Sequence, residues 1–192
     1  MFGKLKVALW TRHIDTILGV TLAMVLGLPP TPGGLRGQAV DEYQVKAAFL
    51  YNIAKFVEWP PGAFKSPSDP IVSCILGASP LEQALELGAG RKTIDNRGFV
   101  LRHISDARQA SGCHILFVSS SERKRWRSVV AAIKSDGILT VGETEGFASE
   151  GGVVNFKLEG DRVRIQINVD AAGRERLRIS SRLLNLAQIV ND

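Results

Sequence analysis

The pattern of apolar and polar residues predicts strands that alternate with helices along most of the chain. Short apolar runs typical of buried strands occur at residues 71–76, 98–105, 113–119 and 138–141. Between them, Ser79-Pro80 favours the start of a helix, and Ser119-x-x-Glu122 precedes a second helical pattern. Together with the C-terminal hairpin described below, this order predicts a single α/β domain with a mixed sheet of about six strands flanked by helices.

The first helix of this domain is predicted over residues 41–58, and its apolar side carries two polar residues. At 100° per residue, one wide arc holds Val45, Ala48, Phe49, Ile53, Phe56, Val57 and Trp59. Asn52 falls near the centre of this arc and Lys46 near one side. Because an unpaired buried amide costs ~1 to 3 kcal/mol, we expect Asn52 to bind the backbone of the Gly-rich segment 142–152. We expect the Lys46 ammonium to reach water along its stem.

Alternating apolar residues near the C-terminus predict an antiparallel hairpin with Gly160-Asp161 as its turn. Apolar residues then face one another in three pairs: Leu158 and Val163, Phe156 and Ile165, Val154 and Ile167. The same register places Lys157 opposite Arg164, and this like-charge pair has two interpretations. The two side chains splay into water beside Glu159, or they meet an acidic ligand or partner.

The last apolar pattern predicts a final helix. Its apolar side is formed by Leu183, Leu184, Ala187 and Val190.

The N-terminus has the pattern of a secretory signal. Lys4, Lys6 and Arg12 precede the apolar run of residues 16–28, and Gly37-Gln38-Ala39 suits a signal peptidase. We therefore predict a signal peptide over residues 1–39 and a domain over residues 40–192. The apolar run is shorter than the ~20 residues that cross a bilayer. An uncleaved anchor is the alternative, and no stable membrane insertion is expected after cleavage.

Composition changes this picture in one respect. The chain has 192 residues, 45% of them hydrophobic, which is enough for one well-formed core. Removal of residues 1–39 takes away four Lys or Arg and one Asp, so the formal net charge falls from +5 to +2. Because nucleic-acid binding needs a concentrated basic surface, no nucleic-acid partner is expected.

The two cysteines, Cys74 and Cys113, each lie in a predicted strand. Export to an oxidising compartment favours a disulfide between them over two buried thiols. Such a bond would join two strands of one sheet and close a loop of about 40 residues. No metal site is expected, because His103 and His114 stand at no ligand spacing from either cysteine.

Catalytic motifs are incomplete. The segment GASPL follows the nucleophile-elbow pattern only to its third residue, and the Gly-rich segment 142–152 has neither GxGxxG spacing nor a terminal Lys-Ser/Thr. The basic run ERKRWR suits the solvated face of an amphipathic helix. We expect no cofactor and no catalytic residues, and binding in place of catalysis. A hydrolase whose site is assembled from distant residues is the alternative.

Several segments together resemble the YfiR-like family of periplasmic proteins. They are KAAFLYNIAKFVEWP, the two Cys-bearing strands, GILTVGETEGFASEGGVVNF, IQINVDAA and LRISSRLLNLA, and they span nearly all of residues 40–192. The resemblance implies a YfiR-like α/β domain that is a non-enzymatic repressor. It would bind the periplasmic sensing domain of a membrane-bound diguanylate cyclase and lower cyclic di-GMP and biofilm formation. Family members tend to form homodimers. Some carry a second cysteine pair, which is absent here, so Cys74 and Cys113 are expected to be structural.

Two groups of residues are candidates for the partner surface. Trp59, Pro60 and Phe64 surround a proline turn, and Lys157 and Arg164 lie on the polar face of the hairpin. The alternative function is a periplasmic sensor without a cyclase partner. It would capture a small anion on Lys157, Arg164 and Arg178.

Overall fold

The computed structural model describes residues 34–89, 92–133 and 137–191. The predicted signal peptide lies outside them as far as residue 33. The chain divides into two compact units, Met1–Leu35 and Arg36–Asp192, and the second unit contains both sheets described below.

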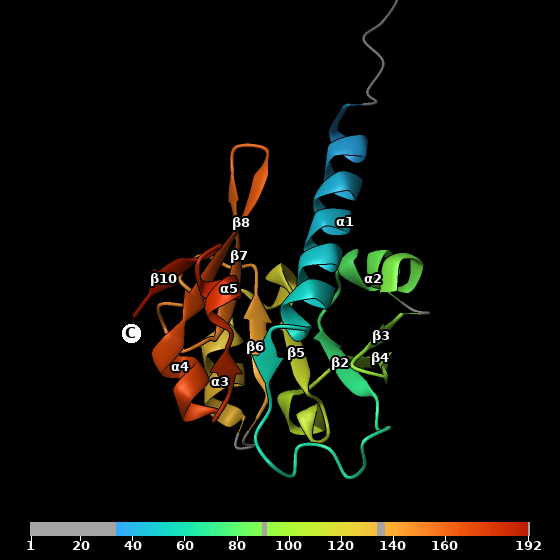
Figure 1. The fold of residues 1–192 in the computed structure, drawn as a ribbon. Coiled ribbons are helices and arrows are strands. Elements are labelled where there is room, and N and C mark those ends of the chain that lie inside the picture. Colours follow the sequence, from blue (N-terminus) through green and yellow to red (C-terminus); the bar gives the residue numbers. More distant parts are fainter. Residues whose placement is uncertain (1–33, 90–91, 134–136, 192) are drawn as a thin grey trace, which may run out of the picture. The chain divides into compact units, whose positions relative to one another are not determined.

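An eight-stranded mixed sheet forms the centre of the second unit (Figure 1), in the order β10-β8-β7-β6-β5-β2-β4-β3. Its strands are β2 (Ile71–Leu76), β3 (Thr93–Ile94), β4 (Arg97–Ile104), β5 (Ile115–Val118), β6 (Leu139–Gly142), β7 (Val154–Glu159), β8 (Arg162–Asn168) and β10 (Gln188–Val190). Neighbouring strands are parallel from β4 to β7, whereas β8 is antiparallel to β7. The predicted mixed α/β domain is confirmed, with more strands than the six expected.

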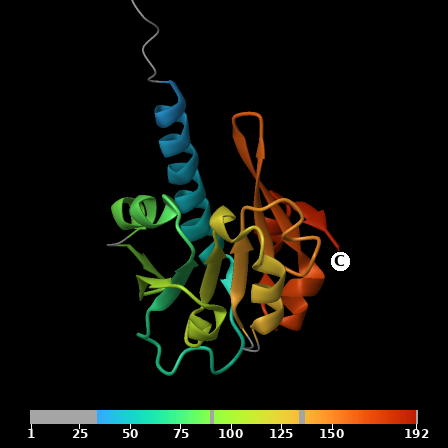
Figure 2. The same ribbon diagram turned by 180° about the vertical axis from the view of Figure 1, so that it is seen from behind.

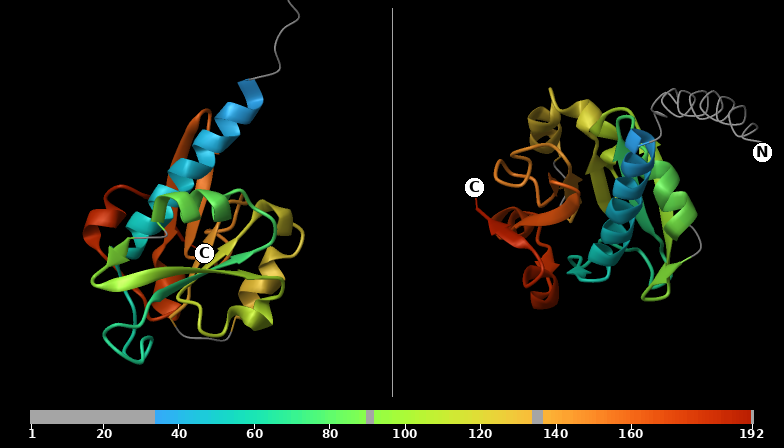
Figure 3. Two further views of the ribbon diagram at one scale, coloured as in Figure 1. Left: turned by 90° about the vertical axis from the view of Figure 1, so that its right-hand side faces the viewer. Right: turned by 90° about the horizontal axis from the view of Figure 1, so that it is seen from above.

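Helices cover both faces of this sheet. They are α1 (Gly34–Ala54), α2 (Leu81–Ala89), α3 (Trp126–Ala132), α4 (Val169–Arg174) and α5 (Ser181–Leu184), with 3-10 turns η1 (Ala107–Ala110) and η2 (Ser120–Glu122). Leu50 of α1 and Leu81 of α2 belong to the larger hydrophobic core, and Trp126 of α3 belongs to a second core with Cys74 and Cys113. Figure 2 shows α3 on the face opposite α1, and the view from above in Figure 3 shows the sheet between them.

The first helix ends earlier than predicted. In place of a helix over residues 41–58, α1 ends at Ala54, and its last turn tightens through the bond from Lys55 N–H to the Asn52 carbonyl. The chain then forms β1 (Val57–Glu58), which pairs antiparallel with β9 (Arg178–Ile179) in a separate two-stranded sheet. Pairing with β9 explains the early end, because Val57 and Glu58 must be extended to pair with Ile179 and Arg178.

The hairpin has the predicted register. Phe156 pairs with Ile165 and Lys157 with Arg164, and the hairpin projects beyond the rest of the sheet beside α1 (Figure 1). The predicted final helix is wrong beyond its first turn, because α5 is four residues long and residues 188–190 form β10, parallel to β8. A short apolar run fits a strand or a helix equally well by periodicity, and pairing with β8 decides between them.

The Gly-rich segment 142–152 packs closely against the second core. Phe147 at its centre is fully buried. A Cβ added at Gly142 would lie 2.3 Å from the Phe147 ring, and one at Gly152 would lie 2.2 Å from it. These two glycines therefore make room for one aromatic ring, which explains the composition of this segment without a phosphate site.

Candidate functional site

The polar residue that α1 buries is Lys46, while Asn52 is exposed. The Lys46 side chain is 4% exposed, and its Nζ lies 2.6 Å from Glu143 Oε2 and 2.5 Å from Glu42 Oε1. Both expectations from the sequence are therefore wrong, and their roles are exchanged: Lys46 holds the Gly-rich segment and Asn52 meets solvent. The helical arc gave the order of residues around the helix, but the side that meets the sheet is centred nearer Leu50 than Asn52.

Glu143 connects α1 with the segment that follows β5. Its carboxylate accepts hydrogen bonds from Ser120 N–H at 2.9 Å and from the Tyr43 hydroxyl at 3.4 Å. Burial by itself lowers the pKa of Lys46, but the hydrogen bonds and charges of Glu143 and Glu42 outweigh it and raise that pKa. Lys46 thus stays charged at neutral pH, so this cluster is suited to holding elements together and unsuited to proton transfer.

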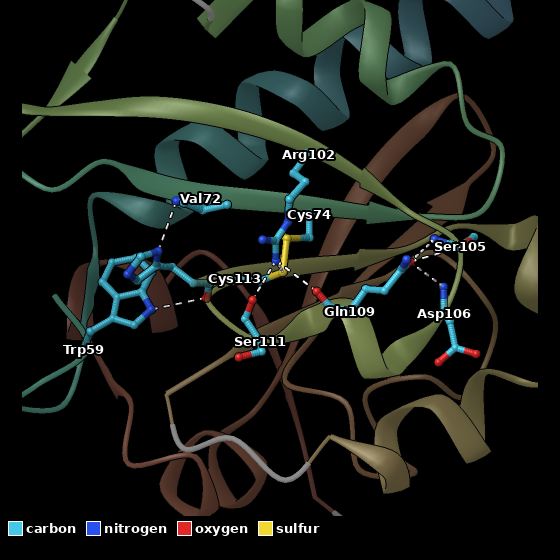
Figure 4. The surroundings of a disulfide bond; sticks show 10 residues. Trp59, Val72, Cys74, Arg102, Ser105, Asp106, Gln109, Ser111 and Cys113 are labelled. Carbon is cyan, nitrogen blue, oxygen red and sulfur yellow. Dashed lines mark hydrogen bonds between the residues drawn. A yellow bond between two sulfur atoms is a disulfide. The ribbon is translucent and has the colours of Figure 1, made fainter. Parts of the chain in front are cut away.

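Trp59 and Phe64 have partners inside the molecule. The Trp59 indole N–H donates to the His114 carbonyl at 3.3 Å (Figure 4), and the Phe64 ring stacks on the His114 imidazole with centroids 4.2 Å apart. The Arg97 guanidinium lies 3.8 Å from the Phe64 ring centroid. Pro60 packs close to the backbone of Gly137. These contacts give the proline turn a rigid attachment to the sheet.

His114 is held as a neutral imidazole. Its Nδ1 accepts the Val72 N–H at 3.1 Å, so Nε2 carries the hydrogen and donates to the Ala63 carbonyl at 3.0 Å. Burial lowers the pKa of His114, and the Arg97 charge adds to that effect. Protonation would place a second N–H against the Val72 amide.

The disulfide between Cys74 and Cys113 is present in the structure (Figure 4). Cys74 is buried in β2, and Cys113 lies just before β5, so the bond joins two neighbouring strands. The Arg102 guanidinium donates to Cys113 Sγ at 2.9 Å and to the carbonyls of Gln109 and Ser111. Arg102 thus holds the η1 turn and the residue after it close to the disulfide.

The hairpin cations lie together, and Glu159 supplies their counter-charge. The Lys157 ammonium lies 3.0 Å from Glu159 and the Arg164 guanidinium 3.7 Å from it. Arg178 lies in the separate sheet, where it pairs with Glu58 at 3.6 Å. The structure therefore groups two of the three residues considered for anion capture and places the third in another sheet.

An apolar groove of about 400 Å³ lies between α1, β8 and α5. Its lining consists of Phe49, Asn52, Ile53, Phe56, Val163, Arg164, Ile165, Leu183 and Leu186. Leu186 is 78% exposed, which is unusual for a side chain of this size and polarity. The groove brings the hairpin cation Arg164 next to apolar surface.

The sequence profile of the YfiR/HmsC-like family matches residues 43–188, most of the chain. The chain belongs to the YfiR/HmsC-like family. Proteins of this family are periplasmic, regulatory and non-catalytic.

Two solved structures share the fold of this YfiR/HmsC-like chain. One is a conserved domain protein from Vibrio cholerae O1 biovar El Tor, with a TM-score of 0.54 and 10% identity over 78% of this chain. The other is an ABC domain from Streptococcus pneumoniae in complex with L-Trp, with a TM-score of 0.51 and 10% identity over 77% of this chain. The chain spans 60% of the length of each. No protein with a curated description matches the sequence.

Two features are absent from the described ranges of this family member. Within residues 34–89, 92–133 and 137–191, no helix is long and apolar enough to cross a membrane. In the same ranges, no three His, Cys, Asp or Glu side chains form a group that could hold a metal ion.

Sequence reasoning missed the groove and the Lys46–Glu143 pair. Each is assembled from segments far apart in the chain, since Lys46 and Glu143 are 97 residues apart. The one available signal for the pair was a lysine on an apolar helix face together with a glutamate at the end of a buried strand.

Proposed function

We propose that this protein binds the periplasmic domain of a membrane-bound diguanylate cyclase and represses the cyclase. Family membership supports a regulatory role in this pathway. The observation that carries the proposal is the apolar groove between α1, β8 and α5, with exposed Leu186 beside it. Apolar surface with a polar rim is typical of a contact site for another protein.

The projecting hairpin extends this surface. Leu158 near its tip is 50% exposed, and Lys157 and Arg164 offer cations to an acidic partner. Because such rim charges are exposed, they contribute mainly to the rate and selectivity of association. Trp59 and Phe64 contribute as a fixed support for the neighbouring turn, since both already contact His114.

Deletion of the gene tests the repression itself. We expect deletion to raise cellular cyclic di-GMP and strengthen biofilm formation, and exported wild-type protein to restore the low level. Unchanged cyclic di-GMP after deletion, in a strain whose cyclase is present and active, would contradict repression and favour the ligand-binding sensor.

Surface variants test where the cyclase binds. We expect Leu186→Asp, and separately Lys157→Gln with Arg164→Gln, to weaken repression while the protein accumulates normally. The matched control is Arg108→Gln with Arg127→Gln, which also removes two exposed, ion-paired cations, from elements outside the groove. Full repression by the Leu186 and hairpin variants would remove this surface from the interface.

A further inference from the structure

In the parallel part of the sheet, the order in which the chain adds strands reverses between β2 and β5. From β2 the chain continues to β4 on one side of it, and β5 and β6 then follow on the other side. Such a reversal opens a crevice outside the carboxyl ends of the two strands, where open α/β sheets bind their ligands. The view from above in Figure 3 looks onto this edge of the sheet.

A cavity of about 600 Å³ lies at this point. Ala78 lines it from the segment after β2, Ser120 and Ser121 from the segment after β5, and Tyr43 from α1. The cavity is open to solvent, and its volume lies in the range of small-molecule sites, ~300 to 1,000 Å³.

The two loops that form the cavity are fixed to each other. The Ser119 hydroxyl donates to the Ala78 carbonyl at 2.6 Å, and the Ser121 hydroxyl accepts the Ala78 N–H at 3.1 Å. Gly77 has φ +86°, and a Cβ at this position would lie 2.4 Å from Ser121 Oγ. Glycine therefore permits the close approach of the loops, and the cavity wall is built in advance of any ligand.

The charge around the cavity is positive. Arg123 and Lys124 both line it, and no acidic side chain is among its lining residues in the described ranges. The Glu143 carboxylate beneath Tyr43 and Ser120 is already paired with Lys46.

Neighbouring cations in the same basic run differ from these two. Arg125 pairs with Glu122 and Arg127 with Glu150. In contrast, neither Arg123 nor Lys124 forms an ion pair with any residue that the structure describes. Of the four cations in this run, the two that form no ion pair with a described residue are thus the two that line the cavity.

From these observations we infer that the cavity binds a small anion carrying a carboxylate or phosphate group. Arg123 and Lys124 attract the anionic group, and the hydroxyls of Ser120 and Ser121 can donate hydrogen bonds to it at the wall, whereas the Tyr43 hydroxyl already donates to Glu143. The site is distinct from the hairpin cations and from the apolar groove. Its ligand is recognised without the cyclase, so the inference does not rest on the proposed function.

Titration of the purified protein with inorganic phosphate and with citrate tests this site. With calorimetry and amide NMR at ~0.15 M salt, we expect saturable binding by at least one probe. Amide shifts should be concentrated at residue 78 and residues 120–124. Arg123→Gln with Lys124→Gln should weaken binding about tenfold, since two exposed charges together contribute on the order of 1.4 kcal/mol.

The control is Arg108→Gln with Arg127→Gln, which removes the same charge from exposed, ion-paired positions outside the cavity. It should keep wild-type affinity, and thermal melts should show that both double variants fold. Absence of saturation with both probes would overturn the inference. Amide shifts centred on the hairpin, or equal weakening in both double variants, would also overturn it. Loss of repression without loss of anion binding would bear only on the proposed function.

Discussion

Lys46 is the residue on which the attachment of α1 to the end of the sheet depends. Replacement by Met keeps the length of the side chain and leaves Glu143, whose side chain is 2% exposed, buried without its ammonium partner. Breaking a buried pair in this way costs ~3 to 5 kcal/mol. We expect urea unfolding to show a loss of this size for Lys46→Met.

Lys55→Met is the control for this measurement, because Lys55 is exposed on the adjoining turn. It should change the free energy of unfolding by less than ~0.5 kcal/mol. Adding Glu143→Leu to Lys46→Met should recover part of the loss, since the orphaned charge is then gone. Equal stability of the two single variants would contradict the role given to Lys46.

His114 should make the protein less stable as the pH falls below neutral. Burial lowers its pKa in the folded state, whereas the unfolded chain has an ordinary His pKa of ~6.5. The unfolded state therefore binds the proton more readily, and stability that is complete above pH ~6.5 declines as the pH falls toward the folded-state pKa. Urea midpoints at about pH 7.5 and 5 measure this decline.

A comparison of two histidine variants isolates the effect. His114→Gln should show a smaller difference between the two pH values than the wild type. His103→Gln is the control, because the His103 side chain is exposed, and it should keep the wild-type difference. An unchanged pH difference in His114→Gln would mean that other groups cause it.

The sequence could not distinguish the roles of Lys46 and Asn52. Both lie at or near the apolar arc, and the arc alone does not show which part meets the sheet. The deciding partner, Glu143, follows a strand that reaches α1 only through the complete fold. Burial of Lys46 is therefore a tertiary property that no local pattern contains.

At the scale of elements, local signals predicted the hairpin and failed for β10. The hairpin register follows from alternation and from Gly160-Asp161, both of which lie within the paired strands. Residues 188–190 become a strand because Ile189 pairs parallel with Ile167, across an intervening helical segment. Parallel pairing of distant segments has no comparable signal in the sequence.

The disulfide should protect the joined elements around β2 and β5. We expect Cys74 and Cys113 to resist alkylation until the protein is both unfolded and reduced, as followed by mass spectrometry. Reduction should lower the free energy of unfolding by ~2 to 4 kcal/mol, because the closed loop spans 39 residues. Two alkylated thiols in unfolded, unreduced protein would show that the bond does not form in the cell.

At the scale of the whole molecule, export predicts a shortened first helix. Mature protein from the periplasm should begin near Val40, and intact mass measures this directly. Cleavage after Ala39 would remove the first turn and a half of α1 and leave Tyr43 and Lys46 in place. A mass that includes residues 1–39 would contradict the predicted cleavage.

The fold class was predictable because alternating strands and helices are visible in the chain, whereas the sites were not. The apolar groove combines α1, β8 and α5, and the cavity at the end of β2 and β5 combines α1 with two further segments. The sequence showed Arg123 and Lys124 only as half of a basic run. The fold separates them from Arg125 and Arg127 by giving the latter two acidic partners.

The small β1–β9 sheet also constrains the order in which the segments of the chain fold. Val57 and Ile179 are neighbours there, although they are about 120 residues apart in the sequence, and Ser180 N–H donates to the Phe56 carbonyl. Contacts between such distant segments form slowly, because a long loop must close before they gain any energy. A chain that emerges N-terminus first therefore makes α1 early but must wait for residue 180 before the exit from α1 is secured. Until then Val57 and Glu58 have no strand partner, and their backbone groups are open to chaperones and to other unfinished chains.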